Sequence, residues 1–115
     1  MHEISLVQAL FSQLEKLARE NGATKVHKVT MVIGPHSGVV LDAFQFGFET
    51  LATENNLVGN AELIIETPPV NYSCSRCGHI EKSAGEKPEE CPECGELFLI
   101  PSGGDEMILR QVEME

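Results

Sequence analysis

Apolar residues near the start of the chain recur at intervals of three and four positions. They fall at Val7, Leu10, Phe11, Leu14, Leu17 and Ala18. This spacing puts them on one side of an amphipathic helix, which we expect from Ile4 to about Glu20 because Asn21-Gly22 is a typical stop. Packed on a core, such a helix holds the amino terminus at a defined place instead of leaving it to fray.

Further along, the pattern changes to short runs rich in β-branched residues. Three runs favour strands, at residues 25–33, 61–66 and 107–114. Between the first two, Asp42 and Gln45 resemble the N-cap and the capping partner of a second helix that continues to about Asn55. We expect this second helix to leave Phe46 partly exposed and to bury Leu41, Phe44, Phe48, Leu51 and Ala52.

Proline and glycine break the pattern at two places. Pro68-Pro69 stops the strand at 61–66, and the Pro- and Gly-rich residues 101–105 precede the last strand. The last strand has nothing to pair with in the short segment between, so it most plausibly returns to the first two. We expect an α+β fold in which residues 1–68 plus 106–115 form a helix-and-three-stranded-sheet domain, with a second domain at 69–105 inserted through hinge-like joints.

All four cysteines of the chain lie in the inserted segment. They form two Cys-x2-Cys hooks, Cys74 with Cys77 and Cys91 with Cys94. Two such hooks can close a tetrahedral thiolate cage on one ion, which is typical of a zinc-ribbon-like structural site. A segment shorter than roughly 40 residues usually needs such a staple to fold, and zinc contributes on the order of 10–16 kcal/mol in comparable peptides.

Other uses of the cysteines fit the sequence less well. Two disulfides would need an oxidising compartment, and no amino-terminal signal segment is visible, which favours reduced thiols in the cytoplasm. A thioredoxin-like redox site would have one Cys-x2-Cys pair at the start of a helix. This chain instead has two such pairs, which can bind the same ion together. Iron in a rubredoxin-like cage has the same ligands and remains an alternative metal.

Charge and composition narrow the classes of partner. The formal net charge is -10, from 18 acidic and 8 basic residues, and there is no Trp and one Tyr. This balance repels phosphate backbones and leaves little for base stacking, so we expect no nucleic acid partner. No apolar run approaches the roughly 18 residues of a membrane span, so we expect no membrane insertion.

The first residues of the chain offer a second metal site. The free amine of Met1, the deprotonated amide nitrogen of His2 and its imidazole can form fused five- and six-membered chelate rings. Nitrogen donors in a plane favour Ni(II) or Cu(II) over zinc. The unperturbed pKa of the amine, about 7.7–8.0, leaves a useful fraction as free base near neutrality. The fourth donor is open between the Glu3 amide or carboxylate, water, His36 and His79.

Three features of the chain together resemble the HypA/HybF family of nickel metallochaperones, which serve maturation of [NiFe]-hydrogenase. The features are the start Met1-His2-Glu3-Ile4-Ser5-Leu6, the turn Ile33-Gly34-Pro35-His36-Ser37-Gly38-Val39, and the two hooks. The resemblance covers essentially the whole chain. It implies an α/β nickel domain with an inserted zinc domain, nickel at Met1, His2 and Glu3, and zinc at Cys74, Cys77, Cys91 and Cys94.

The resemblance also implies a task and two partners. The protein would hand over nickel to the hydrogenase large subunit precursor and would work with a GTPase partner, HypB. It would do so in the cytoplasm as a monomer or weak homodimer. Some family members flank both hooks with histidine, whereas here His79 follows the first hook and Gly95-Glu96 follows the second. We therefore expect His79 to lie beside the cage or at the surface, and the resemblance does not carry over a pH- or nickel-driven change of zinc ligands.

The sequence favours a carrier over an enzyme. It contains no recognisable nucleophile–base pair, phosphate-binding loop or open catalytic metal constellation. Three rival hypotheses remain: a zinc-stapled protein-interaction adaptor without a functional nickel site, a nucleic-acid zinc ribbon, and a thiol redox protein that uses one hook. The negative charge counts against the second, and the paired hooks count against the third.

Overall fold

The computed structural model of the protein describes residues 2–84 and 86–115, which contain two helices and six strands. By contacts the chain divides into two compact units. We call Met1–Met31, Val39–Ile65 and Ile108–Glu115 the helix–sheet unit, and Val32–Gly38 with Glu66–Met107 the cysteine unit. The α+β class predicted from the sequence is confirmed. By contacts, the turn at 32–38 belongs to the cysteine unit. The inserted domain expected from the sequence, at residues 69–105, does not include this turn.

Helix α1 spans His2–Asn21 and is amphipathic as predicted. Its buried side chains include Val7, Leu10, Phe11, Leu14 and Ala18. The helix ends at the predicted stop, where Gly22 has a φ of 66° and the Ala23 N–H donates to the Ala18 carbonyl at 2.8 Å. Its first residue is His2, two positions before the predicted start. No helix in the described ranges has the length and apolar character needed to cross a membrane.

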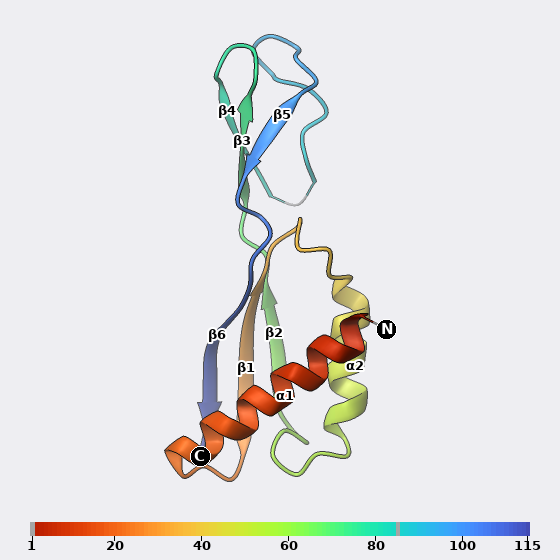
Figure 1. The fold of residues 1–115 in the computed structure, drawn as a ribbon, viewed down its shortest axis with the longest axis vertical. Helices are drawn as coiled ribbons and strands as arrows, with labels where there is room; N and C mark the ends of the chain where they lie inside the picture. The colour runs from red at the N-terminus through yellow and green to blue at the C-terminus, as the bar shows by residue number, and fades with distance from the viewer. Residues whose placement is uncertain (1, 85) are drawn as a thin grey trace. The chain divides into compact units, whose positions relative to one another are not determined.

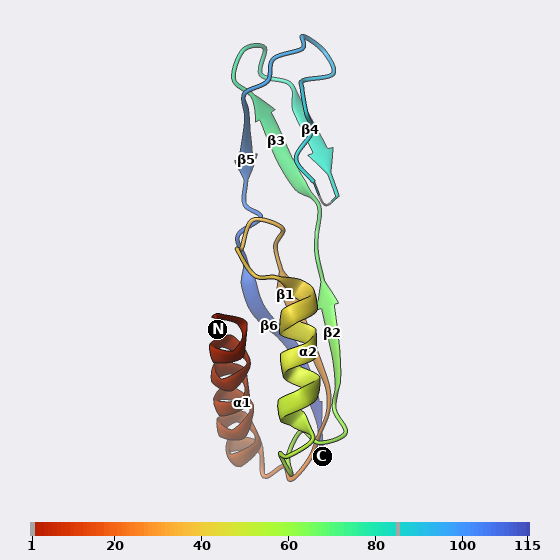
Figure 2. The same ribbon diagram turned by 90° about the vertical axis from the view of Figure 1, so that its right-hand side faces the viewer.

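Helix α2 spans Leu41–Ala52 and packs against α1 within the helix–sheet unit (Figure 2). Phe44 and Phe48 are completely or almost completely buried, and the Phe48 ring meets Phe11 edge-on with centroids 5.4 Å apart. Gly47 lets the helices approach closely, because an added Cβ would lie 3.0 Å from the Ile4 Cδ1 atom. Phe46 faces outward and is 70% exposed.

The predicted start of the second helix is wrong. The N-cap is Val40, with φ −81° and ψ 108°, and no side chain caps it. Asp42 lies inside the first turn, where its charge still favours the positive end of the helix. Leu41, predicted to be buried, is 36% exposed because it is the first helical residue. At the other end the helix stops before Asn55, whose side-chain oxygen accepts N–H bonds from the next turn.

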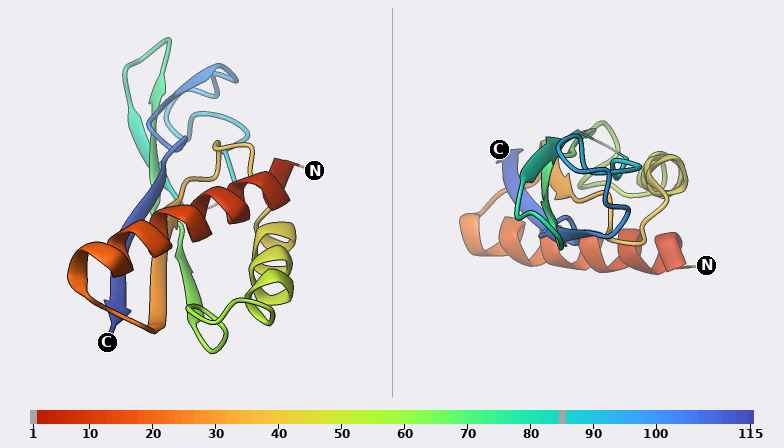
Figure 3. Two further views of the ribbon diagram at one scale, coloured as in Figure 1. Left: turned by 60° about the horizontal axis from the view of Figure 1, so that its bottom comes forward. Right: turned by 90° about the horizontal axis from the view of Figure 1, so that it is seen from above.

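One three-stranded sheet belongs mainly to the helix–sheet unit. Strands β1 (Val26–Ile33), β2 (Glu62–Glu66) and β6 (Met107–Met114) are arranged in the order β2-β1-β6. The last strand therefore returns to the first two, as the sequence predicts. Helix α1 runs across one face of this sheet, at an angle to the strands (Figures 1 and 3). The central strand β1 accordingly carries the largest share of buried apolar residues, among them Val26, Val29, Met31 and Ile33.

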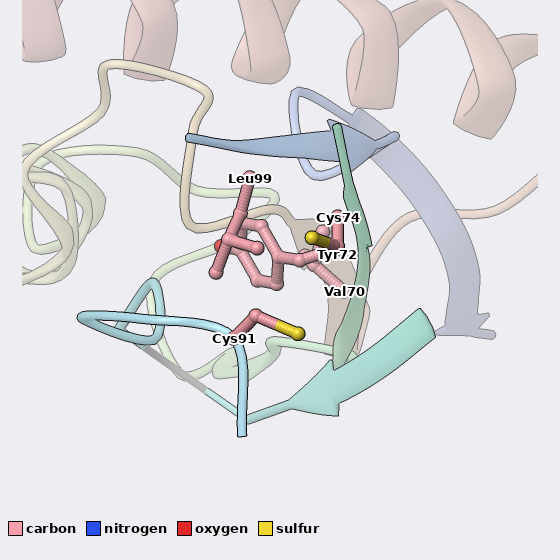
Figure 4. Close-up of a cluster of buried hydrophobic side chains, with 5 residues drawn as sticks. All are labelled: Val70, Tyr72, Cys74, Cys91 and Leu99. Carbon is pink, nitrogen blue, oxygen red and sulfur yellow. The ribbon is translucent and has the colours of Figure 1, made fainter. Parts of the chain in front are cut away.

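The cysteine unit contains a second antiparallel sheet, formed by β3 (Val70–Cys74), β4 (Ile80–Ser83) and β5 (Leu99–Ser102) in the order β4-β3-β5. Side chains alternate along β3, so its first, third and fifth residues face the core. The core consists of Val70, Tyr72, Cys74, Cys91 and Leu99 (Figure 4). Just before strand β5, the N–H groups of Leu97 and Phe98 donate to the Glu96 carboxylate.

We predict that two phenylalanines on α2 differ sharply in their contribution to stability. Phe48→Ala should lower the free energy of unfolding by about 3–5 kcal/mol, because it leaves a cavity against Phe11. Phe46→Ala, the matched control on the exposed side, should change it by less than about 0.5 kcal/mol. Urea unfolding followed by circular dichroism measures both. Similar losses for the two variants would contradict this assignment of the buried face.

Candidate metal centres

The four cysteines come together in the cysteine unit as the hooks predict. The Sγ atoms of Cys74 and Cys94 are 3.5 Å apart, those of Cys77 and Cys91 are 3.7 Å apart, and all four lie within 4.8 Å of one another. Tetrahedral zinc with bonds of about 2.3 Å would place its sulfur ligands about 3.8 Å apart. Within 2–84 and 86–115 this is the one group of three or more candidate ligands close enough to share an ion. We call it the cage.

Both hooks reach the cage through the same local turn. The Gly78 N–H donates to the Cys74 carbonyl at 3.1 Å, and the Gly95 N–H donates to the Cys91 carbonyl at 2.9 Å. Both glycines have a positive φ, 80° and 79°, a conformation that residues with a Cβ rarely adopt. The Gly that follows each Cys-x2-Cys pair is therefore required by the turn, and it turns the backbone so that N–H groups face sulfur.

Backbone N–H groups stabilise negative charge on the first hook. The Cys74 Sγ accepts hydrogen bonds from the backbone N–H groups of Arg76 and Cys77, each at 3.4 Å. The bond from Cys77 is the main reason that the pKa of the Cys74 thiol falls to about 6, and it outweighs the opposing effect of burial. Cys74 is therefore already a thiolate near neutral pH and is ready to bind a metal cation.

The other thiols show why the cage needs a cation. The Glu96 N–H bonds to Cys94 and favours its thiolate, yet desolvation of the thiolate and the three neighbouring sulfurs raise the pKa of Cys94 to about 12. The pKa of Cys77 is also raised: the His79 N–H opposes the rise, while desolvation, Cys74 and Cys91 cause it. Four thiolates this close repel one another unless a positive ion lies among them. The donor set therefore fits a divalent metal.

The cage and the hydrophobic core of the cysteine unit are continuous. Cys74 and Cys91 are buried, with exposed fractions of 4% and 2%, while Cys77 and Cys94 lie at the surface. In Figure 4 the two buried cysteines reach the core from strand β3 and from the second hook, beside Tyr72 and Leu99. Two candidate ligands of the cage are therefore also members of this core.

His79 contributes to the first hook through its backbone. Its carbonyl oxygen accepts the Cys74 N–H at 2.8 Å, and its imidazole Nε2 lies 3.1 Å from a carboxylate oxygen of Glu81. The backbone of His79 thus adjoins the first hook, and its ring is paired with a carboxylate. A role for His79 as an auxiliary nickel donor remains a prediction.

The amino-terminal candidate site is seen in part, because Met1 lies outside the described residues. His2 is exposed and is the first residue of α1. The backbone N–H groups of His2 and Glu3 lie in the first turn of α1, where N–H groups have no acceptor within the helix. The His2 amide is therefore not used by the helix, and its imidazole is accessible to solvent. Nickel binding here remains a prediction.

The Glu3 side chain has a partner that sequence analysis did not find. Glu3 is only 8% exposed, and its Oε2 atom accepts the backbone N–H of Val40 at 3.2 Å. This hydrogen bond is the main cause of a lowered pKa of the Glu3 carboxyl, so the side chain is charged at neutral pH. The carboxylate thus joins the first turn of α1 to the N-cap of α2. Nothing in the local sequence points to this contact between distant positions.

His36 and Tyr72 form the other contact that the sequence did not reveal. The His36 Nε2 lies 2.5 Å from the Tyr72 hydroxyl oxygen, and the rings meet edge-on with centroids 5.8 Å apart. Both residues belong to the cysteine unit. A usable signal existed for Tyr72, since alternation from Cys74 places it on the same side of the strand. The auxiliary metal role of His36 remains a prediction.

Comparisons with known proteins agree with one another. A family model described as "HypA: Hydrogenase/urease nickel incorporation, metallochaperone, hypA" matches residues 1–114. A hydrogenase maturation factor HypA from Aquifex aeolicus is 38% identical over 115 residues, covering 100% of this chain and 98% of that protein. Another from Chlorobium luteolum is 33% identical over 112 residues, covering 97% of this chain and 94% of its own length.

Solved structures extend the likeness to the fold. The solution structure of the Ni metallochaperone HypA from Helicobacter pylori is similar with a TM-score of 0.65 and 31% identity, over 97% of this chain and 96% of that one. A second solution structure of a HypA protein has a TM-score of 0.67 and 32% identity, over 100% and 97% of the two chains. Sequence and fold thus agree over almost the whole length, and the chain belongs to the HypA family.

Proposed function

We propose that this protein is a nickel metallochaperone that binds Ni(II) at Met1, His2 and Glu3 and delivers it to the large subunit of [NiFe]-hydrogenase during maturation. The observation that carries the proposal is the match of residues 1–114 to the family of nickel incorporation proteins. The exposed His2 at the start of a packed helix supports it. In this proposal the protein transfers an ion and catalyses no reaction.

The position of the site at a helix N-terminus suits a carrier. The positive end of the helix dipole opposes a cation there and also favours proton loss from the amine and the first amides. Binding therefore depends on the chelate formed by Met1 and His2, and the exposed ion can leave for a partner. Protons compete for the amine, the amide and the imidazole together, so acid releases the metal.

The proposal assigns structural zinc to the cage. Four thiolates at tetrahedral spacing are the usual ligand set of structural zinc, and no open coordination position is needed. Iron would accept the same ligands, but no feature of the chain calls for electron transfer. In this role zinc holds the cysteine unit folded and is not handed over.

Delivery requires partners that accept an acidic carrier. With a net charge of -10, the protein favours basic surfaces and disfavours nucleic acid. The GTPase HypB and the hydrogenase large subunit precursor are the partners that the proposal names, in the cytoplasm, where thiols stay reduced. The chain would act there as a monomer or weak homodimer.

An adaptor without a nickel site is the second candidate. It is favoured by large exposed apolar side chains in the cysteine unit, Ile80, Leu97 and Phe98, which are 62%, 71% and 63% exposed. Such side chains commonly mark protein contacts when they gather in a patch. Both candidates use the cage, so only the amino terminus distinguishes them.

We predict that nickel binding depends on the free amine and on His2. A protein with one extra residue before Met1, and the variant His2→Ala, should each bind Ni(II) at least about 10–100-fold more weakly, a loss that even outer partners of metal ligands cause. Isothermal titration with untagged, zinc-loaded protein measures the affinity, and mass spectrometry verifies the terminus.

The matched control for this experiment is His27→Ala. His27 is an exposed histidine on β1 that pairs with Glu115, so its loss should leave nickel affinity and folding unchanged. Unchanged nickel affinity in both the extended protein and His2→Ala would exclude the amino-terminal chelate and favour the adaptor.

We predict that the cage stabilises one unit more than the other. Cys91→Ala should abolish zinc binding and unfold the cysteine unit, because it removes a ligand and leaves the buried Cys74 thiolate without a cation beside it. Glu93→Ala, an exposed change inside the same hook, should retain zinc. Amide exchange followed by NMR should show loss of protection in 66–107 and retained protection in α1 and α2. Equal loss in both units would show that their stabilities are not separable.

A further inference from the structure

A groove lies at the open edge of the sheet in the helix–sheet unit. Strand β6 stands last in the order β2-β1-β6, and within the described residues no strand pairs with its other side. The groove lies between this strand and the second half of α1, and its volume is about 630 Å³. Ligand pockets commonly have volumes of about 300–1,000 Å³. All lining residues belong to the helix–sheet unit, and we call this space the β6 groove.

The lining shows that the β6 groove reaches the backbone of the strand. At the end of the chain it is lined by residues 109–112, Met114 and Glu115. Successive side chains of a strand point to opposite faces of the sheet, so a pocket on one face would be lined by every second residue. Contact with consecutive residues therefore places the groove at the strand edge, where backbone N–H and carbonyl groups are within reach.

Helix α1 forms the opposite wall of the groove. Gln13, Leu17 and Asn21 line it and are spaced by four positions, so they form one row along the helix. In Figure 3 the second half of α1 crosses β6, and the first residues of α1 lie at the other end of the helix. His2 and Gln13 are about 16 Å apart along the helix axis, from the rise of about 1.5 Å per residue. A short segment in the groove thus leaves His2 accessible.

An open strand edge beside a helix suits an extended peptide. In β-strand addition, a peptide pairs with an exposed sheet edge through its backbone, and every second side chain enters a neighbouring pocket. The β6 groove offers Leu17, Leu109 and Val112 to such side chains. Its lining contains one positive and one negative residue, Arg110 and Glu115, so it carries no formal net charge. Apolar side chains therefore suit the groove better than charged ones.

The charge of the whole chain distinguishes between two kinds of occupant. The net charge of -10 repels a second copy of the chain, and it attracts a peptide that carries basic residues. Charged residues on an edge strand, here Arg110 and Glu113, are also a common protection against self-pairing. The lining and the net charge together favour an extended segment that has apolar residues facing the groove and basic residues facing solvent.

We propose that the β6 groove binds an extended segment of a partner protein, apolar at alternate positions and basic between them, which adds to β6 as a further strand of the sheet. Backbone hydrogen bonds to β6 supply the affinity, and the apolar side chains contact α1. This interaction goes beyond the proposed function and does not depend on nickel. It holds the partner at the second half of α1 while the start of that helix stays accessible.

The test uses two synthetic peptides and zinc-loaded, nickel-free, full-length protein labelled with nitrogen-15. The first peptide alternates valine and lysine over about eight residues, the length of a strand. The second has the same sequence with methyl groups on its backbone nitrogens, so it keeps the charges but loses the donors. The first peptide should slow exchange of those β6 amides that face the outer edge. The second should bind at least about 10-fold more weakly, because its backbone hydrogen bonds are lost.

A matched pair of variants locates the binding site. Gln13→Trp places a bulky side chain in the groove from an exposed position of α1, so it should weaken binding of the first peptide at least about 10-fold. Gln8→Trp, at an exposed glutamine of the same helix outside the lining, should leave binding unchanged. Circular dichroism and zinc content should match the wild-type values in both variants.

Any one of four results would overturn the proposal. No binding of the first peptide excludes this occupant, and equal binding of both peptides shows attraction by charge alone. Binding that Gln13→Trp leaves unchanged places the peptide elsewhere. A wild-type dimer in sedimentation, with the outer β6 amides protected before peptide is added, makes the groove an interface between two copies. Nickel binding at the amino terminus is measured separately, so these results leave the proposed function untouched.

Discussion

The feature on which the rest of the cysteine unit depends is the close approach of four sulfur atoms, which can all be thiolates near neutral pH only when a cation lies among them. The pKa of Cys74 near 6 and that of Cys94 near 12 describe a site where the first thiolate forms readily and the last resists ionisation. A divalent metal offsets half of this negative charge and can bind all four sulfur atoms at once. Because Cys74 and Cys91 also belong to the hydrophobic core, the ion and the core stabilise each other, and a short segment can fold that otherwise lacks sufficient apolar surface.

The proposed nickel site differs from the cage in the type of its ligand atoms and in its exposure to solvent. The cage uses soft, charged side chains, two of them buried, whereas the terminus offers nitrogen donors at an exposed helix start where the dipole opposes a cation. In the proposed function, the cage retains its ion and the amino terminus releases its ion to a partner. Both belong to a chain that matches the HypA family over residues 1–114.

Sequence analysis predicts this fold where the pattern is local or repeated. The spacing of Val7 through Ala18 predicts the buried face of α1, and the paired hooks predict the cage. It fails where contacts join distant positions. Asp42 and Gln45 imitate a capping pair, but the N-cap is Val40, whose N–H is held by Glu3 from the first turn of α1. The contact of His36 with Tyr72 is hidden for the same reason, since no periodicity relates the two residues.

The account is tested most directly by X-ray absorption at both metal edges, on full-length untagged protein that holds one equivalent each of zinc and nickel. The central claim is that the zinc ion stays in the cage while the nickel ion binds separately and is released. Zinc should show four sulfur neighbours at about 2.3 Å. Nickel should show nitrogen and oxygen neighbours alone, in a planar arrangement. Sulfur bound to nickel, or loss of sulfur from zinc when nickel is added, would contradict the account.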